Sequence, residues 1–215
     1  ECNGEFIAFC DGDDLWEKDK LEVQLPLFNK PHVGVVYSEV SYIDEHDKRY
    51  EKEPPYHRYH GKVTEQLLEK NFVPFGTAVI RRACIDNNGI FNNEYKMGID
   101  WDLWLRYSLD WEFSFCPAKT YIYREWSGQM SNNMTGRYKY AFKILESFVA
   151  NHGQRVSNKA IKNSWADMYI SRGVAIARTQ GDVKQPLIDI LRGLMMKPSS
   201  VYGWKALIKL MIRRV

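Results

Sequence analysis

Three carboxylates stand together near the start of the chain, in the segment FIAFCDGDDLW at residues 6–16. The apolar residues before them predict a short buried strand, so Asp11, Asp13 and Asp14 follow its carboxyl end. Open α/β sheets bind ligands at that end of their strands, and carboxylate oxygens are good ligands for hard divalent cations. Asp11 and Asp13 could therefore hold a cation against a diphosphate, where the cation would act as a Lewis acid.

The same acids also have a purely structural explanation. Asp14 and Glu17 are three residues apart, which fits a capping box at the start of a helix that we expect at residues 15–29. Pro26 should bend or interrupt that helix near its end. On the residues alone, a turn with a helix cap explains the segment as well as a cation site does, and both interpretations stay open.

A second group of acids lies in KMGIDWDLWLRYS at residues 96–108, where the apolar spacing predicts a helix over 100–109. Asp100 and Asp102 are two residues apart, so on a helix they point to different faces and do not form a ligand pair for one ion. Asp100, at the helix start, could act as a general base that deprotonates a sugar hydroxyl. It could also be the helix N-cap, and without further information the cap is the better explanation.

The elements that must position these acids alternate between strand and helix over residues 1–134. Besides the first strand at 5–10, strands are expected at 32–44, 76–82, 113–116 and 119–124, and short helices at 63–71 and 82–91. A polar loop containing prolines joins residues 44 and 63. From about Tyr138 onward, apolar residues recur with the period of a helix. We therefore expect an α/β domain at 1–134 and a helical appendage at 135–215.

The composition favours a globular chain and gives no reason to expect nucleic acid as a partner. Of its 215 residues, 45% are hydrophobic, and 30 basic against 27 acidic residues give a net charge of only +3. No apolar run approaches the roughly 20 residues that span a bilayer, and no signal peptide is recognised, which predicts a cytoplasmic protein. Four cysteines without CxxC spacing are expected to be free thiols in a reducing compartment: Cys2, Cys10, Cys84 and Cys116.

Four motifs, in this order, resemble family 2 glycosyltransferases of the GT-A fold. They are FCDGDDLW (9–16), NFVPFGTAVIRR (71–82), IDWDLWLRY (99–107) and YREWSGQMS (123–131). A segment of the KLExQL type at residues 20–25 follows the first motif, as it does in that family. The resemblance covers residues 1 to about 131 and implies a partial GT-A, Rossmann-like mixed sheet flanked by helices, with a helical appendage after it.

The resemblance also implies an activity and a set of site residues. Asp11 and Asp13 would bind Mn²⁺ or Mg²⁺ together with a nucleotide-sugar donor, and Asp100 would be the catalytic base of an inverting transfer to an acceptor hydroxyl. No QxxRW-like motif follows Asp100, so the transfer would be non-processive. The acceptor, a glycan or a lipid-linked glycan of polysaccharide biosynthesis at the cell envelope, would contact Arg82, Trp101, Asp102 and Trp126.

Two departures from the family pattern bear on this interpretation. Ile99 replaces the usual glutamate before the base, and Trp126 stands where a histidine that can assist at the metal is common. In addition, the acids that hold the nucleotide base in the family would lie before Glu1. We therefore expect little transferase activity from this chain alone, and an unpaired sheet edge at the strand 5–10 that could promote association.

The last predicted helix, at residues 200–214, carries apolar and basic residues on different faces. The apolar face comprises Trp204, Leu207, Ile208 and Met211, and the basic face comprises Lys205, Lys209 and Arg213. A basic amphipathic helix of this kind can lie on an anionic membrane, which suggests peripheral contact at the inner face. The other interpretation, that the apolar stripe packs on a neighbouring helix, stays open.

Two other classes of protein compete with the transferase. One is a non-catalytic carbohydrate-binding or interaction module derived from the same fold, which Ile99 and Trp126 favour and which the acids Asp13 and Asp100 oppose. The other is a phosphatase of the haloacid-dehalogenase type, in which a strand is also followed by two acids. Asp14 and Leu15 fit that pattern poorly, and the segment around Asp100 would have no role there.

Overall fold

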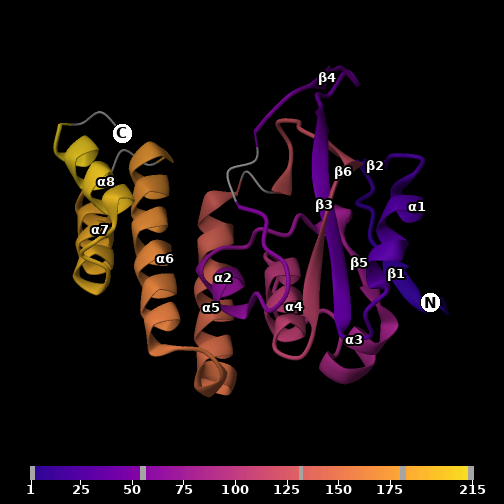
Figure 1. Ribbon diagram of the computed structural model, residues 1–215. Helices are drawn as coiled ribbons and strands as arrows, with labels where there is room; N and C mark the ends of the chain where they lie inside the picture. Colours follow the sequence, from indigo (N-terminus) through magenta and orange to yellow (C-terminus); the bar gives the residue numbers. More distant parts are fainter. Residues whose placement is uncertain (1–2, 54–56, 131–132, 180–182, 213–215) are drawn as a thin grey trace. The chain divides into compact units, whose positions relative to one another are not determined.

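The computed structural model describes residues 3–53, 57–130, 133–179 and 183–212, and the chain forms two compact units (Figure 1). The first, which we call the sheet unit, comprises Glu1–Leu67, Asn71–Glu94 and Ile99–Asn132. The second, the helical unit, comprises Leu68–Lys70, Tyr95–Gly98 and Asn133–Val215.

A six-stranded sheet forms the centre of the sheet unit. Its strands are β1 (Phe6–Ala8), β2 (Leu15–Trp16), β3 (Val33–Ile43), β4 (Arg49–Tyr50), β5 (Val79–Arg81) and β6 (Glu112–Arg124). They run in the order β1-β5-β3-β6-β2, and β4 pairs with the end of β3. The long strands β3 and β6 lie side by side and parallel, whereas the other pairs are antiparallel (Figure 1). The sheet is therefore mixed, as expected.

The core is built on β3 because its sequence, VGVVYSEVSYI, is an almost continuous apolar run. Val35, Val36 and Tyr37 have no exposed surface. The segments at 113–116 and 119–124, predicted as two strands, form the single strand β6. Its register against β3 shifts between Ser38 and Glu39, so Pro117 and Ala118 are accommodated in a bulge and the pairing continues beyond them.

Short helices connect the strands of the sheet unit. They are α1 (Lys20–Gln24), the 3-10 helices η1 (Leu25–Phe28) and η2 (Phe75–Thr77), α2 (Thr64–Glu69), α3 (Arg82–Asn88) and α4 (Ile99–Ser108). The expected end of α3 is confirmed, because Gly89 is its C-cap with φ of 74°. The expected helix at 100–109 is confirmed by α4.

The predicted capping box of Asp14 and Glu17 is wrong. Leu15 and Trp16 pair with β6 as β2, and α1 begins only at Lys20, with Asp19 as its N-cap. Pro26 lies at the start of η1, so the expected interruption of the helix is confirmed. The side chain of Asp14 instead accepts hydrogen bonds from two groups of β6, the Tyr121 hydroxyl and the Arg124 backbone N–H.

A buried polar cluster ties α1 to η2 and β6. Lys20 is almost completely buried, and its Nζ donates to Gln24 Oε1 and to the Thr77 carbonyl oxygen, both at 2.8 Å. Gln24 Nε2 also donates to that carbonyl oxygen, at 2.9 Å, and Thr120 Oγ1 donates to Gln24 Oε1. Burial lowers the pKa of Lys20 to about 7. The cluster thus fixes the turn at η2, and it does so by burying an amine, which is unfavourable for the charged form of Lys20.

The described residues of the helical unit form four long helices. These are α5 (Met134–His152), α6 (Asn158–Thr179), α7 (Lys184–Met196) and α8 (Val201–Met211), with the 3-10 helix η4 (Gly153–Arg155) after α5. α6 packs against the other three, and α7 also packs against α8. A Cβ on Gly193 would lie 2.5 Å from the Ile170 side chain, so a glycine is required where α7 crosses α6. A bidentate pair of Arg172 with the buried Asp189 joins the same two helices, with both contacts at 2.7 Å.

Three further expectations concern the described residues. Cys10, Cys84 and Cys116 are free thiols as predicted, whereas Cys2 lies outside the described residues. β1 ends the sheet and pairs with β5, and its role in association stays a prediction. None of the described helices is both long and apolar enough to cross a bilayer.

The buried amine of Lys20 makes stability depend on pH. Between its folded pKa of about 7 and its ordinary value of 10.5, the unfolded chain holds a proton that the folded chain does not, so stability rises with pH. We expect the free energy of unfolding of the native chain to gain about 2 kcal/mol between pH 7 and pH 9 relative to Lys20→Met. Urea denaturation at both pH values measures this difference.

The exposed Lys18 provides the matched control. Lys18→Met should leave the pH dependence of the native chain unchanged. An equal gain in stability for the native chain and for Lys20→Met would show that the Lys20 amine stays protonated in the folded state.

Candidate active site

The acids after β1 form a tight turn. The backbone N–H of Asp14 donates to the carbonyl oxygen of Asp11 at 3.2 Å, which closes the turn over Gly12 and Asp13. The side chains of Asp11 and Asp13 are exposed, whereas Asp14 is only 6% exposed. The three carboxylates thus divide into one that faces the protein and two that face solvent.

The hydroxyl group of Tyr121, on β6, organises this turn. It donates to Asp14 Oδ2 at 2.7 Å, accepts from the backbone N–H of Asp11 at 3.3 Å and lies 3.5 Å from Asp11 Oδ2. Burial is the main cause that raises the pKa of Tyr121, and its bond to Asp14 raises it further, so it stays a donor. A protonated phenol is therefore fixed between two of the acids.

Arg124 is the second residue of β6 that holds the turn. Its backbone N–H donates to Asp14 Oδ1 at 2.7 Å, and its Nε donates to the Asp13 carbonyl oxygen at 2.9 Å. Its Nη1 pairs with Asp47 at 2.7 Å. The carboxylate of Asp14 therefore accepts a hydrogen bond on each oxygen, which is what a buried acid requires.

Gly76, in η2, packs directly against Tyr121. A Cβ at this glycine would lie 1.9 Å from Cζ and 2.1 Å from Oη of the tyrosine, which leaves no room for any side chain. The same turn is held from the other side by the bonds of Lys20 and Gln24 to the Thr77 carbonyl oxygen. The side chain of Tyr121 consequently positions both the acid turn and η2.

Asp100 lies in the first turn of α4 and faces this region. Asn71 Nδ2 donates to Asp100 Oδ2 at 2.8 Å. Although Asp11 is exposed as a residue, partial burial of its carboxyl group beside Tyr121 raises its pKa, and the charges of Asp14, Asp13 and Asp100 raise it further. Asp100 is thus close enough to the acid turn for its charge to act there, although the two segments are far apart in the sequence.

The other acid of α4 has a different task, as its position predicted. Asp102 accepts from Arg106 Nε at 3.0 Å and from Arg106 Nη2 at 2.8 Å. The same guanidinium donates to the carbonyl oxygen of Ile90, beyond the end of α3. Asp102 thus orients an arginine that joins two helices.

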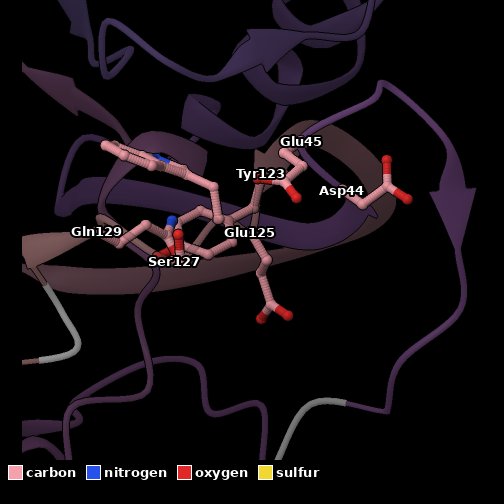
Figure 2. A pocket seen from close by; sticks show the side chains of 7 residues that line it. Asp44, Glu45, Tyr123, Glu125, Ser127 and Gln129 are labelled. Carbon is pink, nitrogen blue, oxygen red and sulfur yellow. The ribbon is translucent and has the colours of Figure 1, made fainter.

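Trp126 contacts the acid turn and is 42% exposed. Its Nε1 donates to Asp13 Oδ2 at 3.0 Å. It also lines an open hollow with a volume of about 440 Å³. Figure 2 shows the hollow, with Asp44 and Glu45 after β3 on one side, Tyr123 and Glu125 at the end of β6, and Ser127 and Gln129 beyond them.

Two of the predicted site residues lie elsewhere. Arg82 begins α3, and its Nε donates to the Gly4 carbonyl oxygen, at the end of β1 away from the acids. Trp101 is buried, and its Nε1 donates to the Leu67 carbonyl oxygen at 2.7 Å. The structure therefore brings together Asp11, Asp13 and Trp126, and the charge of Asp100 acts on Asp11. Arg82 lies away from them, and the ring of Trp101 is covered with protein.

Sequence reasoning missed the residues that hold the acids. Tyr121 and Arg124 belong to a segment predicted only as a strand, and Gly76 is predicted as the start of the strand at 76–82, whereas it lies in η2. No local pattern indicates that Tyr121 and Arg124 contact Asp14, more than one hundred positions away, or that Gly76 packs against Tyr121. Asn71 lies within one of the recognised motifs, but its bond to Asp100 has no signal in the sequence.

The bond between Tyr121 and Asp14 predicts a pH-dependent loss of stability in Tyr121→Phe. This change leaves a buried carboxylate oxygen without a donor, which should lower the free energy of unfolding by about 1.5–3 kcal/mol near pH 7. Because the bond favours the ionised acid, the loss should shrink as the pH falls and Asp14 becomes protonated in both proteins. Chemical denaturation across that pH range measures it.

Tyr123→Phe is the matched control, because it makes the same change two residues along β6 at a ring that packs against Tyr42. A loss in Tyr121→Phe that stays constant down to acidic pH would show that the hydroxyl does not stabilise the ionised acid.

Comparison with known proteins assigns the chain to a family. The chain matches the family described as glycosyltransferase like family 2 over residues 1–172. WfgD of Escherichia coli, named as a UDP-Glc:alpha-D-GlcNAc-diphosphoundecaprenol beta-1,3-glucosyltransferase, is 27% identical over 157 residues, which cover 72% of this chain and 59% of WfgD. The uncharacterised protein Rv1520 of Mycobacterium tuberculosis is 29% identical over 123 residues, which cover 56% of this chain and 35% of Rv1520.

The fold matches solved structures as well. TarS 1–349 of S. aureus, in complex with UDP-GlcNAc, superposes with a TM-score of 0.61 at 14% sequence identity, over 97% of this chain and 66% of that chain. The chain therefore spans less than two thirds of the length of these relatives. The GT-A-like mixed sheet flanked by helices, with further helices after it, is confirmed, and the chain belongs to glycosyltransferase-like family 2.

Proposed function

We propose that the chain carries the cation-binding and acceptor part of an inverting, non-processive glycosyltransferase. The arrangement that carries this proposal is the exposed acid turn after β1, which the Tyr121 hydroxyl organises, together with Asp100 of α4, which Asn71 holds. One acid faces solvent in the turn after β1, and the other lies in the first turn of α4. The exposed acid pair could bind a cation that stabilises a charged leaving group, and the carboxylate of Asp100 could act as a base.

The donor is proposed to be a UDP-sugar. The names of WfgD and of the TarS complex both include a uridine diphosphate sugar. Among the described residues, no three acid, histidine or cysteine side chains converge on one point. Mg²⁺ and Mn²⁺ accept such a sparse set, because one or two carboxylates together with substrate phosphates and water complete the coordination. Asp11 and Asp13, which are exposed oxygen donors, fit this description.

The proposed reaction is a single displacement at the anomeric carbon of the sugar. Asp100, oriented by Asn71, takes the proton of the acceptor hydroxyl while the acceptor oxygen bonds to the anomeric carbon from the opposite face to the diphosphate. The bond to the diphosphate breaks, and the nucleoside diphosphate departs with the electron pair. A bound divalent cation would supply Lewis-acid stabilisation of the diphosphate.

The acceptor is proposed to be a glycan, and by analogy with the name of WfgD a lipid-linked one at the inner face of the cell membrane. The hollow beside Trp126 supports a sugar, because an exposed indole ring suits the apolar face of a pyranose and the polar groups around it can bind hydroxyl groups. Glu125 and Gln129 are the polar residues of the hollow that we assign to this role.

The 215-residue chain by itself is proposed to have little activity, because it spans only part of each relative. A non-catalytic carbohydrate-binding module is the second candidate. The observation in its favour is the bond from Trp126 Nε1 to Asp13 Oδ2, which engages one oxygen of the proposed cation ligand.

Two substitutions separate catalysis from donor binding. In the full-length protein, Asp100→Asn should lower kcat by about 10²–10⁴ because the general base is lost, while a Mn²⁺-dependent rise in melting temperature with UDP-sugar remains. Asp13→Asn should abolish that rise. Sugar transfer from UDP-glucose and UDP-GlcNAc, together with thermal shift, provides the measurements.

The exposed Asp19 provides a control, and Asp19→Asn should change neither quantity. Transfer at the native rate by Asp100→Asn would contradict the assignment of the base. Glycan binding by a full-length protein that neither binds a UDP-sugar nor transfers one would support the carbohydrate-binding module instead.

A further inference from the structure

Exposed apolar residues concentrate at the end of the chain. Of the eighteen large hydrophobic residues that are exposed in the described structure, eleven lie within residues 183–212. This segment contains α7 and α8 and is a small part of the whole. Scattered exposed apolar residues are normal for a soluble domain, but a concentration of this kind marks an interaction surface.

The apolar stripe of α8 faces outward. Its members are Val201, Trp204, Ile208 and Met211, which recur at helical spacing and are between 49% and 74% exposed. The helix packs on α6 and α7 through Gly203, Ala206 and Leu210 instead. The sequence left open that the apolar face of Trp204, Leu207, Ile208 and Met211 packs on a neighbouring helix. Of these four residues, Leu207 packs partly against the core, whereas Trp204, Ile208 and Met211 are exposed.

Small residues on the inner face explain why the large ones remain outside. A Cβ on Gly203 would lie 2.8 Å from the side chains of Ile170 and Leu194, so α8 approaches its neighbours very closely. α7 follows the same rule, with Gly193 against α6 and with Leu187, Leu191 and Met195 exposed on its other face. Both helices thus carry an outward apolar stripe, and Figure 1 shows them side by side.

The exposed side-chain charges carried by the described residues of α7 and α8 have one sign. The exposed ionisable residues of the described segment 183–212 are Lys184, Arg192, Lys205 and Lys209. Asp189, an acid of the same segment, is fully buried in its pair with Arg172. The predicted basic residue Arg213 lies outside the described residues. An apolar surface bordered by bases complements an apolar layer bordered by anions, which is the surface of an anionic bilayer.

We propose that the outward surface of α7 and α8 docks on an anionic lipid bilayer. The indole of Trp204 suits this role, because its Nε1 already donates to the Pro198 carbonyl oxygen at 2.8 Å. Its ring can therefore enter the apolar layer without losing a hydrogen bond to water. Tyr202, also exposed, adds a second amphipathic ring of the kind that gathers at membrane interfaces.

A second copy of the chain is a poorer occupant of this surface. In a symmetric dimer each stripe would meet its own equivalent, and the bases that border it would face one another. Lipid phosphates instead neutralise those bases. The docking proposal rests on α7 and α8 alone and does not depend on the proposed transfer reaction, although it would bring the enzyme to the layer that holds a lipid-linked acceptor.

Vesicle flotation of the 215-residue chain tests the proposal directly. We expect the chain to float with phosphatidylcholine vesicles that contain about one third phosphatidylglycerol, and only weakly with phosphatidylcholine alone. The double variant Lys205→Glu, Lys209→Glu should bind at least about 20-fold more weakly. The double variant Trp204→Ser, Ile208→Ser should bind about 100-fold more weakly. Because all four side chains are exposed, melting temperatures should match that of the native chain.

Matched controls make the same changes on the sheet unit. Lys18→Glu with Lys62→Glu, and Leu21→Ser with Leu25→Ser, alter exposed residues and should leave vesicle binding unchanged. Failure of the native chain to float with anionic vesicles would overturn the proposal. So would a concentration-dependent dimer in light scattering that disappears in Trp204→Ser, Ile208→Ser, because the surface would then be a protein interface.

Discussion

One phenolic hydroxyl group connects the parts of the sheet unit that carry the candidate site. Tyr121 donates to the buried carboxylate of Asp14, accepts from the backbone of Asp11 and packs against Gly76, where no side chain fits. Its strand, β6, is paired along its length with the most buried strand of the sheet. The core therefore fixes the positions of the acid turn and of the turn at η2. The distance between the two turns is set by Tyr121, so it does not require either turn to be rigid by itself.

The repulsion among the acids of the turn points to a functional role. Asp14 is compensated by donors from Tyr121 and Arg124, as a structural acid should be. Burial raises the pKa of both Asp14 and Asp11, but two hydrogen bonds act against it at Asp14, whereas at Asp11 the charges of the neighbouring acids add to it. Holding several carboxylates close together destabilises the folded chain, and natural proteins keep such conflicts mainly at functional sites. A divalent cation bound by Asp11 and Asp13 would relieve the conflict when the substrate diphosphate arrives.

The sequence predicts those features whose signal is local. The strand before the acids, the helix at Asp100 and the glycine cap of α3 follow from apolar periodicity and backbone preference. The capping box at Asp14 failed because a donor 107 residues away competes for the same carboxylate, and no spacing rule contains that contact. The division of the acids into separate roles was predicted from helical geometry for Asp100 and Asp102. The residues that hold the site, by contrast, are visible only after the sheet has formed.

In the helical unit, by contrast, the exposed apolar residues are visible in the sequence but contribute little to folding. Its core is supplied by residues such as Ile170, Leu194 and Leu210, and glycines allow the helices to approach closely. Polar residues at the positions of Trp204 and Met211 would leave that core intact, because both side chains point away from it. Stability therefore does not explain an apolar stripe bordered by bases. The proposed docking on an anionic bilayer would explain it, because such a bilayer offers an apolar layer and anionic headgroups at the same surface.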